Sequence, residues 1–289
     1  MSKNKRINII IPAKNEEAGL KKILPIIRGV VPNAEIIVVD DASDDSTAKV
    51  AIESGCRVIT HPRNMGNGAS IKTGARNANA DILVFMDADG QHNPEDIPLL
   101  LEKLEENYDM VIGARSFGGH SSIARFTANN FYNKLASFMT GFKIDDLTSG
   151  FRAVKADKFK KFLYLLPNGF SYPTTSTMAF FRSGFPVAYI PIKTSRRAGT
   201  SKIKLLKDGT RFFIIILKVG ALFSPMRLFL PISAFFFAIA CMYYGYTYFT
   251  EGRFTNMSAL LYITSILTFL IGIVSEQISS LHYKNTDDI

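Results

Sequence analysis

Short apolar segments and helical patterns alternate along the first 115 residues of the chain. The apolar segments are rich in Ile and Val and are bounded by Gly, Pro, Asp or Asn, as buried parallel strands usually are. Strands that alternate with helices indicate an α/β fold, in which helices cover both faces of a mostly parallel sheet. We expect strands at residues 7–11, 35–39, 57–60, 82–86 and 110–112, and helices at residues 16–28, 46–54, 69–78 and 94–106.

The pattern is mixed from about residue 118 to residue 199. A helix is expected near residues 122–139 and a strand near residues 187–191. We interpret this stretch as the second half of the same domain. The first predicted domain therefore covers residues 1–202.

Two long apolar segments occupy the last third of the chain. Residues 228–249 are 22 uncharged residues, which as a helix span about 33 Å. Residues 257–275 add 19 uncharged residues, about 28 Å, after a short polar linker. Each length suits a bilayer, whereas buried helices of a soluble domain, the alternative, usually carry a polar face. We predict a transmembrane hairpin within residues 228–289 that ends in a short cytoplasmic tail.

A helix of a different kind is expected before the hairpin, at residues 203–223. At 100° per residue its cations fall on one narrow stripe, opposite an apolar face. A basic amphipathic helix beside membrane spans is typical of one that lies in the interface against anionic headgroups. The alternative is a surface helix packed on the first domain. We assign residues 203–227 to this interfacial region, whose stripe consists of Lys204, Lys207, Arg211 and Lys218.

Charge placement adds an orientation. The net charge of +9 fits nucleic acid, anionic lipid or a phosphorylated substrate, but nine Lys and Arg residues crowd between residues 193 and 227. The hairpin linker holds only Arg253, beside Glu251, so the positive-inside rule places the large domain in the cytoplasm. Cations beside membrane spans argue against a nucleic-acid partner. The two cysteines lie far apart, which excludes a disulfide framework or a zinc site.

Polar side chains follow four of the expected strands. The first strand runs into Pro12-Ala-Lys-Asn-Glu16, the second into Asp40 and Asp41, the fourth into Asp87-Ala-Asp-Gly-Gln91, and the last into Arg115. Parallel strands place their carboxyl ends at one edge of a sheet, where ligands of such folds bind. We therefore expect a site at this edge.

Carboxylates one residue apart just after a buried strand can share one hard cation. Asp87 and Asp89, with the amide oxygen of Gln91, suit Mg²⁺ or Mn²⁺, and such an ion can bridge the phosphates of a nucleotide diphosphate. Asp41 is expected to bind the base or the ribose of this nucleotide. Alternatively, Asp40 and Asp41 cap the N-terminus of the following helix.

Two further features, a glycine-rich turn and a histidine, give weaker indications of function. The Asn64-x-Gly66-x-Gly68 segment lacks the Lys of a phosphate-binding loop, so we expect a tight turn and the start of a helix. A supporting contact from this turn to the bound nucleotide is left open. No catalytic histidine is expected, although His92 lies close to the metal turn.

Six motifs occur in an order that resembles the inverting family-2 glycosyltransferases of the A-type, Rossmann-like fold, over residues 5–205. Within that family the chain is most similar to the polyprenyl-phosphate (dolichyl- or undecaprenyl-phosphate) mannose or glucose synthases. The motifs are Pro12-Ala-Lys-Asn-Glu16, Val38-Val-Asp-Asp-Ala-Ser43, Asp87-Ala-Asp-Gly-Gln91, Gly113-Ala-Arg115, Thr148-Ser-Gly-Phe-Arg152 and Arg196-Arg-Ala-Gly-Thr-Ser-Lys202.

The resemblance implies that a hexose passes, with inversion and metal assistance, from a UDP- or GDP-linked sugar to polyprenyl phosphate in the membrane. Lys14 stands where the family often has Tyr, which leaves recognition of the base open. Residues 170–176 lack a Glu that many members carry, which leaves the sugar open. The implied roles are catalysis for Asp89, Arg115, Arg196 and Lys202; donor binding for Pro12, Lys14, Glu16, Val39, Asp41, Asp87 and Ala88; acceptor-phosphate binding for Arg125, Asn129 and Ser201; and Mg²⁺ or Mn²⁺ binding for Asp87, Asp89 and Gln91.

The nature of the acceptor decides which chemistry is needed. A phosphate monoester is largely dianionic near neutral pH and can attack the anomeric carbon without a general base. A hydroxyl acceptor on a glycolipid or glycan needs a carboxylate base, for which Asp145 or Asp146 could serve. A non-catalytic membrane scaffold that only binds nucleotide is a third reading. Pairing of the two spans between protomers leaves a homo-oligomer open.

Overall fold

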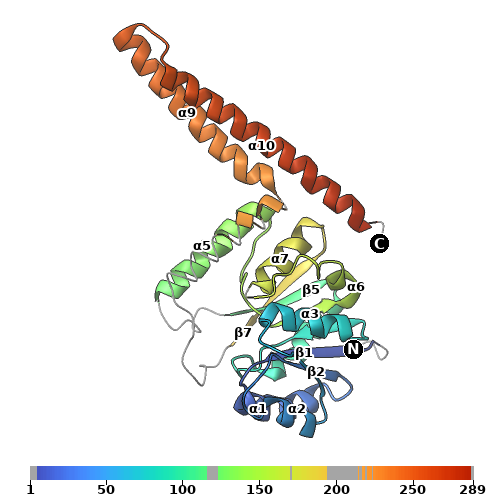
Figure 1. Cartoon of the computed structure of the whole chain (residues 1–289). Helices are drawn as coiled ribbons and strands as arrows, with labels where there is room; N and C mark the ends of the chain where they lie inside the picture. The colour runs from blue at the N-terminus through green and yellow to red at the C-terminus, as the bar shows by residue number, and fades with distance from the viewer. Residues whose placement is uncertain are drawn as a thin grey trace. The chain divides into compact units, whose positions relative to one another are not determined.

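A computed structural model of the chain describes residues 5–115, 123–169, 171–193, 214, 217–218, 220–222 and 224–287 (Figure 1). For residues 123–128 and 282–287 it describes the backbone alone. The chain divides into two compact units. One holds residues 1–134 and 143–212, and the other holds residues 135–142 and 213–289. The predicted boundaries after residues 202 and 227 stay predictions.

The described residues of the first unit form a seven-stranded sheet with the order β3-β2-β1-β4-β6-β5-β7. Among these strands only β6 runs antiparallel to its neighbours. The expected α/β fold with a mostly parallel sheet is confirmed. The strands are β1 Ile7–Ala13, β2 Glu35–Asp40, β3 Arg57–Thr60, β4 Ile82–Phe85, β5 Met110–Arg115, β6 Arg152–Lys155 and β7 Val187–Ile192.

Helices cover both faces of this sheet, with α1 and α2 on one side and α3 and α6 on the other (Figure 1). Successive strand residues face opposite sides, so Ile9 and Ile11 pack with α1 and α2. On the other face Gly74 of α3 lies so close to β1 that a Cβ there would be 2.4 Å from Ile10. The helices are α1 Glu17–Val30, α2 Thr47–Glu53, α3 Asn67–Asn77, η1 Pro94–Asp96, α4 Ile97–Glu105, α5 Ile123–Thr140, α6 Ala156–Lys160 and α7 Tyr172–Arg182.

The region read as mixed contains β6, α6 and α7, which the hydrophobic pattern did not predict. β6 has only four residues, and both its first and its last are cations. α7 is buried along ten of its eleven residues, although its first half is Thr- and Ser-rich rather than apolar. β6 and α7 therefore lack the apolar periodicity on which the predictions of strands and helices depended.

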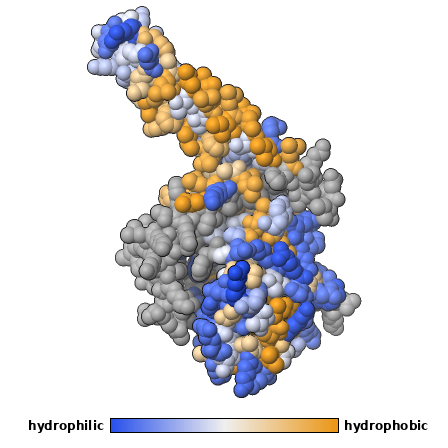
Figure 2. Space-filling model, in the orientation of Figure 1, coloured by the Kyte–Doolittle hydropathy of each residue, from blue (hydrophilic) through white to orange (hydrophobic). Residues whose placement is uncertain are grey.

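The second unit contains two long apolar helices, α9 Pro225–Glu251 and α10 Asn256–Asp287. Both are long and apolar enough to cross a membrane. In the most apolar stretch of each helix, only 11% of α9 and 17% of α10 is buried. Hydrophobic surface covers the hairpin and gives way to hydrophilic surface at the linker (Figure 2). Residues 214, 217–218 and 220–222 are helical, and the rest of the expected interfacial helix lies outside the described residues.

Small residues spaced seven apart line the contact between the two helices. Ser233 of α9 and Ser265 of α10 each donate to the other's carbonyl oxygen, at 2.9 and 3.0 Å. Small side chains let helix backbones approach closely, which is how helices associate in lipid. The two buried rows are Ser233, Ala240 and Thr247 on α9, and Ser258, Ser265, Gly272 and Ser279 on α10.

A Gly272→Leu variant is expected to weaken the hairpin by about 1–3 kcal/mol, the usual cost of overpacking a well-packed contact. A Cβ at Gly272 would be 2.8 Å from Phe229 Cβ. Gly245→Leu is the matched control, because a Cβ there meets nothing within 4 Å. Unfolding of both variants in detergent, followed by circular dichroism, compares them. Equal stability of the two would contradict this packing.

Candidate active site

The strand order reverses at β1, which lies between β2 and β4. Such a switch point opens a crevice at the carboxyl ends of the strands, where ligands of α/β sheets bind. The loop after β1 and the Asp87–Gln91 turn after β4 both begin at this edge, because β1 and β4 are parallel neighbours. Gly19 of α1 lies directly against this turn, because a Cβ on Gly19 would be 2.0 Å from the Ala88 carbonyl oxygen. The turn therefore rests on α1.

A Gly19→Ala variant is expected to displace the Asp87–Gln91 turn and to lower the free energy of unfolding by about 1–3 kcal/mol. The clash is with a backbone oxygen, which cannot rotate away. Gly29→Ala, on the same helix with nothing within 4 Å of its Cβ, is the matched control. That control is expected to be neutral or stabilising by about 0.5–1 kcal/mol. Chemical denaturation distinguishes the two, and equal effects would show that α1 does not hold the turn.

The Asp87–Gln91 turn presents acidic side chains beside a buried one. Ala88 is 2% exposed and packs in the core, whereas the flanking Asp87 and Asp89 are half-buried. The backbone N–H of Gln91 donates to Asp89 Oδ1 at 3.1 Å, and Gly90 has a φ of +68°, which closes the turn. The turn thus holds two carboxylates within reach of solvent at the switch point.

His92 follows this turn and is buried. Its ring stacks on Phe151 with centroids 5.2 Å apart, and its Nε2 lies 4.0 Å from Asp87 Oδ2. Burial lowers the pKa of His92 to about 4, against the opposing effect of the nearby Asp89 carboxylate, so the ring is neutral at pH 7. His92 therefore packs in the protein interior beside Asp87. The sequence indicated only that His92 lies close to the metal turn.

Arg115, at the end of β5, is held by Asp146. Its Nε and Nη2 donate to the two Asp146 carboxylate oxygens at 2.8 and 2.9 Å, and Nη2 also donates to the Thr148 hydroxyl. Burial alone would raise the pKa of Asp146, but the Arg115 guanidinium outweighs it and holds that pKa below its usual range. Asp146 is therefore ionised and a weak base. Asp145 is exposed and pairs with Lys143 at 2.9 Å.

Asp41 points into the protein, where it is 5% exposed. Its carboxylate accepts from the backbone N–H groups of Met65 and Gly66 at 2.7 and 2.8 Å, and from His61 Nδ1 at 2.8 Å. Burial opposes ionisation, but these donors outweigh it and lower the pKa of Asp41. Asp41 thus ties the end of β2 to the loop before α3, and no sequence pattern predicts its partner His61.

The structure tests two further predictions for these loops, a helix cap at Asp40 and Asp41 and a tight turn before α3. The helix-cap alternative for Asp40 and Asp41 is wrong, because α2 begins at Thr47 and Ser46 stands at its N-cap. Gly66 has a φ of +96° and precedes the first residue of α3. The expected tight turn and helix start are therefore confirmed.

The predicted site residues divide by where the structure places them. Pro12 and Val39 are buried within β1 and β2, and Lys14 and Glu16 are half-buried in the loop after β1. With Asp41, Asp87, Ala88, Asp89, Gln91 and Arg115 they lie at the carboxyl edge of the sheet. Asn129 is half-buried on α5, and the side chain of Arg125 lies outside the described part. Arg196, Ser201 and Lys202 also lie outside the described residues.

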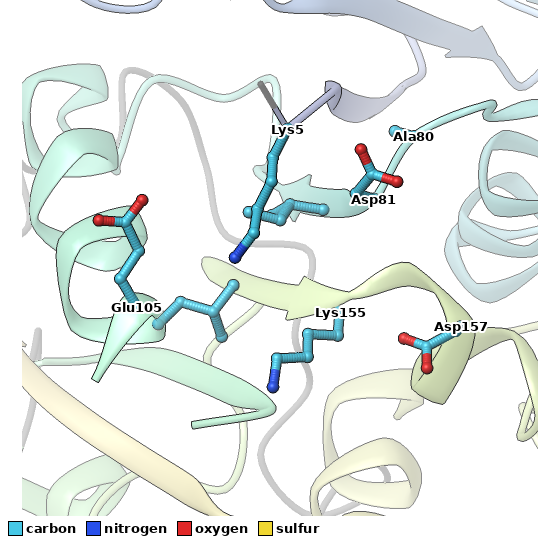
Figure 3. A pocket seen from close by; sticks show the side chains of 8 residues that line it. Lys5, Ala80, Asp81, Glu105, Lys155 and Asp157 are labelled. Atoms are coloured by element: carbon cyan, nitrogen blue, oxygen red, sulfur yellow. The ribbon is translucent and has the colours of Figure 1, made fainter. Parts of the chain in front are cut away.

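A surface pocket lies at the opposite edge of the same sheet. Lys5 and Asp81, which line it, precede β1 and β4. Its lining mixes cations with carboxylates (Figure 3), and Lys155 pairs with Asp109 at 2.7 Å. This pocket is therefore separate from the candidate site.

Comparison with protein-family models confirms the resemblance. The model described as Glycosyl transferase family 2 matches residues 8–163, more than half of the chain. A second model, described as GtrB C-terminal hairpin, matches residues 224–281. The two matches correspond to the sheet domain and to the pair of apolar helices.

One named relative matches along both parts of the chain, and a second matches about two thirds of it. The chain is 27% identical over 307 residues to the undecaprenyl-phosphate 4-deoxy-4-formamido-L-arabinose transferase of Photorhabdus laumondii, covering 96% of this chain and 90% of the relative. It is 32% identical over 213 residues to the undecaprenyl-phosphate mannosyltransferase of Micrococcus luteus, covering 68% and 87%.

A solved structure supports the fold. Glucosyl-3-phosphoglycerate synthase from Mycobacterium tuberculosis, in complex with Mn²⁺, uridine diphosphate and glucosyl-3-phosphoglycerate, matches with a TM-score of 0.61 at 21% identity. The match covers 75% of this chain and 80% of that one. The expected A-type fold is thereby confirmed.

Proposed function

The chain belongs to glycosyl transferase family 2, and on that premise we propose that it transfers a hexose from a nucleotide diphosphate sugar to polyprenyl phosphate, with inversion. The observation that carries this proposal is the acidic Asp87–Gln91 turn at the switch point of a chain that also contains an apolar hairpin. The two relatives named as undecaprenyl-phosphate sugar transferases support the lipid acceptor.

A divalent cation, Mg²⁺ or Mn²⁺, would be held by Asp87, Asp89 and Gln91. Oxygen donors of this kind suit either ion. Among the described residues no group of three or more His, Cys, Asp or Glu forms a complete metal cage. Such a partial donor set fits Mg²⁺, which usually keeps waters and binds substrate phosphates through one or two carboxylates. When bound, the ion neutralises charge on the departing diphosphate.

The donor nucleoside would bind between the ends of β1 and β2. Lys14 and Glu16 are half-buried there, and buried Pro12 and Val39 shape the floor. Asp41 would contribute at most through the oxygen lone pairs that the loop before α3 leaves open. UDP- and GDP-sugars are the candidate donors.

The state of Asp146 favours a phosphate acceptor over a hydroxyl. Arg115 holds the pKa of Asp146 low, so this carboxylate is a poor general base. A phosphate monoester needs no such base; it needs cations that position it and screen its charge. Arg115 would serve the donor phosphates, and the acceptor phosphate would meet Arg125, Asn129, Arg196, Ser201 and Lys202.

The hairpin would keep the enzyme where its acceptor resides. A polyprenyl chain gains about 0.8 kcal/mol per CH₂ buried in the bilayer, so it stays there while its phosphate sits among the headgroups. The crowd of cations between residues 193 and 227, set against the lone Arg253 in the linker, favours a sheet domain on the cytoplasmic side. A homo-oligomer through the spans is compatible with this anchor.

A transfer assay in detergent tests the proposal. The purified chain is incubated with polyprenyl phosphate, Mg²⁺ or Mn²⁺, and a panel of radiolabelled UDP- and GDP-sugars. Label that enters the organic phase and disappears with EDTA would support the proposal and identify the donor. Nucleotide binding without transfer from any donor would contradict it. Asp157 is an exposed carboxylate on α6, away from the carboxyl edge. Asp157→Asn is therefore the control for the Asp89→Asn variant, which removes a carboxylate of the metal turn.

A further inference from the structure

Arg152 is the largest fully buried side chain of the described residues, with 0% exposure. It begins β6 and pairs with Phe85 of β4 and Ile112 of β5, so it stands in the middle of the sheet. Burying a charge is unfavourable unless it is paired and hydrogen-bonded. A cation at this position therefore needs a reason beyond packing.

The partners of its guanidinium are neutral. Nη1 donates to Ser176 Oγ at 2.9 Å, to Thr177 Oγ1 at 3.1 Å and to the Pro173 carbonyl at 3.2 Å, and Nη2 donates to the Ser149 carbonyl. Within the described part of the chain, Nε has no hydrogen-bond partner. Arg152 thus joins α7 to the segment that precedes β6 through neutral acceptors.

That segment, residues 146–151, touches the candidate site along its length. Thr148 contacts Arg115, and the Ser149 hydroxyl donates to the Gly113 carbonyl at 2.6 Å. Phe151 stacks on His92. We name residues 146–151 the support segment.

Gly150 is the point where the support segment meets the metal turn. A Cβ on Gly150 would be 2.9 Å from Asp87 Oδ2 and 3.2 Å from the Tyr172 hydroxyl. Tyr172 is buried at the start of α7 and donates to the Gly150 carbonyl at 2.9 Å. Its ring also lies 5.7 Å from the Arg152 guanidinium carbon. Any shift of α7 or of the segment would therefore reach Asp87.

We propose that Arg152 is a positioning residue that fixes the support segment against α7 and thereby sets the place of the Asp87 carboxylate for divalent cation binding. This inference rests on the proposed metal and diphosphate site. The planar fork is essential to it, because one guanidinium reaches both the Ser149 carbonyl and the acceptors on α7. A lysine retains the charge but presents a single ammonium.

Mn²⁺ binding in the presence of saturating UDP tests the proposal, with free Mn²⁺ measured by electron paramagnetic resonance on the detergent-solubilised full chain. Arg152→Lys is expected to raise the Mn²⁺ dissociation constant at least about tenfold, by analogy with the loss of groups that orient metal ligands. Lys155→Met removes the other cation of β6, at the far edge of the sheet, and is the matched control. It is expected to stay within about twofold of the wild type.

Tyr172→Phe removes one hydroxyl and keeps the ring, so it serves where Arg152 variants do not fold. Loss of the bond to Gly150 is expected to weaken Mn²⁺ binding about threefold to tenfold. Wild-type affinity in folded Arg152→Lys or in Tyr172→Phe would overturn the proposal. Failure of the wild type to bind Mn²⁺ with UDP would instead overturn the metal site itself, and this inference with it.

Discussion

Asp89→Asn is expected to lower kcat/KM for sugar transfer roughly 10²–10³-fold, the usual loss when one group that stabilises transition-state charge is removed. The substitution keeps the size of the side chain and an oxygen that can accept from the Gln91 N–H, so the turn should keep its shape. What it removes is the negative charge that would hold the cation beside the departing diphosphate.

Transfer rates over a range of Mn²⁺ concentrations measure this effect. The variant should unfold at the same temperature as the wild type, and Asp157→Asn should transfer at the wild-type rate. A loss of less than about tenfold, smaller than the usual effect of groups that act on a metal site indirectly, would show that Asp89 is not part of the catalytic machinery.

Asp146→Asn is expected to destabilise the protein by about 3–5 kcal/mol, because it leaves the half-buried Arg115 guanidinium without its carboxylate. Transfer should fall about a hundredfold as well, since Arg115 loses the charge of its partner and one of the two side-chain acceptors that orient it. The double variant Arg115→Met/Asp146→Leu separates the two effects. Replacing a buried ion pair by apolar residues is often neutral, so much of the lost stability should return.

Activity should not return with stability in this double variant. Denaturation curves and transfer rates of the single and double variants, measured side by side, give the comparison. If the double variant transferred sugar at close to the wild-type rate, Arg115 would have a structural role only, and its assignment to the donor phosphates would be wrong.

The carboxyl edge of the sheet could be predicted from sequence because its strands have a clear apolar pattern. β1, β2, β4 and β5 are short runs of Ile and Val, and each ends at residues that cannot continue a buried strand. Side chains that follow such strands must meet at one edge. The acidic turn after β4 and Arg115 after β5 were therefore found without coordinates.

The support for that edge could not be predicted in the same way. Arg152 is fully buried, although a cation in a pattern indicates exposure. The partnership of His61 with Asp41 joins positions 20 apart in the chain, and no period or spacing links them. Asp41, expected to face a ligand, instead uses most of its hydrogen-bonding capacity inside the protein.

The apolar hairpin was predicted from hydropathy, but its second helix is longer than the expected span. α10 continues past residue 275 because Glu276 finds a partner: its carboxylate accepts from the Met226 N–H at 3.2 Å, in the first turn of α9. A carboxylate is favourable at a helix N-terminus. The charge that ended the expected span therefore does not end the helix.

Two acceptors that differ only in the phosphate distinguish a phosphate nucleophile from a hydroxyl nucleophile. Polyprenyl phosphate and the corresponding free polyprenol are offered at equal concentration, with the donor found in the panel and Mn²⁺. We expect labelled lipid from polyprenyl phosphate and none from the free polyprenol, and transfer to the phosphate that is roughly 10²–10³-fold slower with Asp89→Asn. Equal or preferred transfer to the free alcohol would contradict it, because a hydroxyl nucleophile requires a general base that the Arg115–Asp146 pair does not supply.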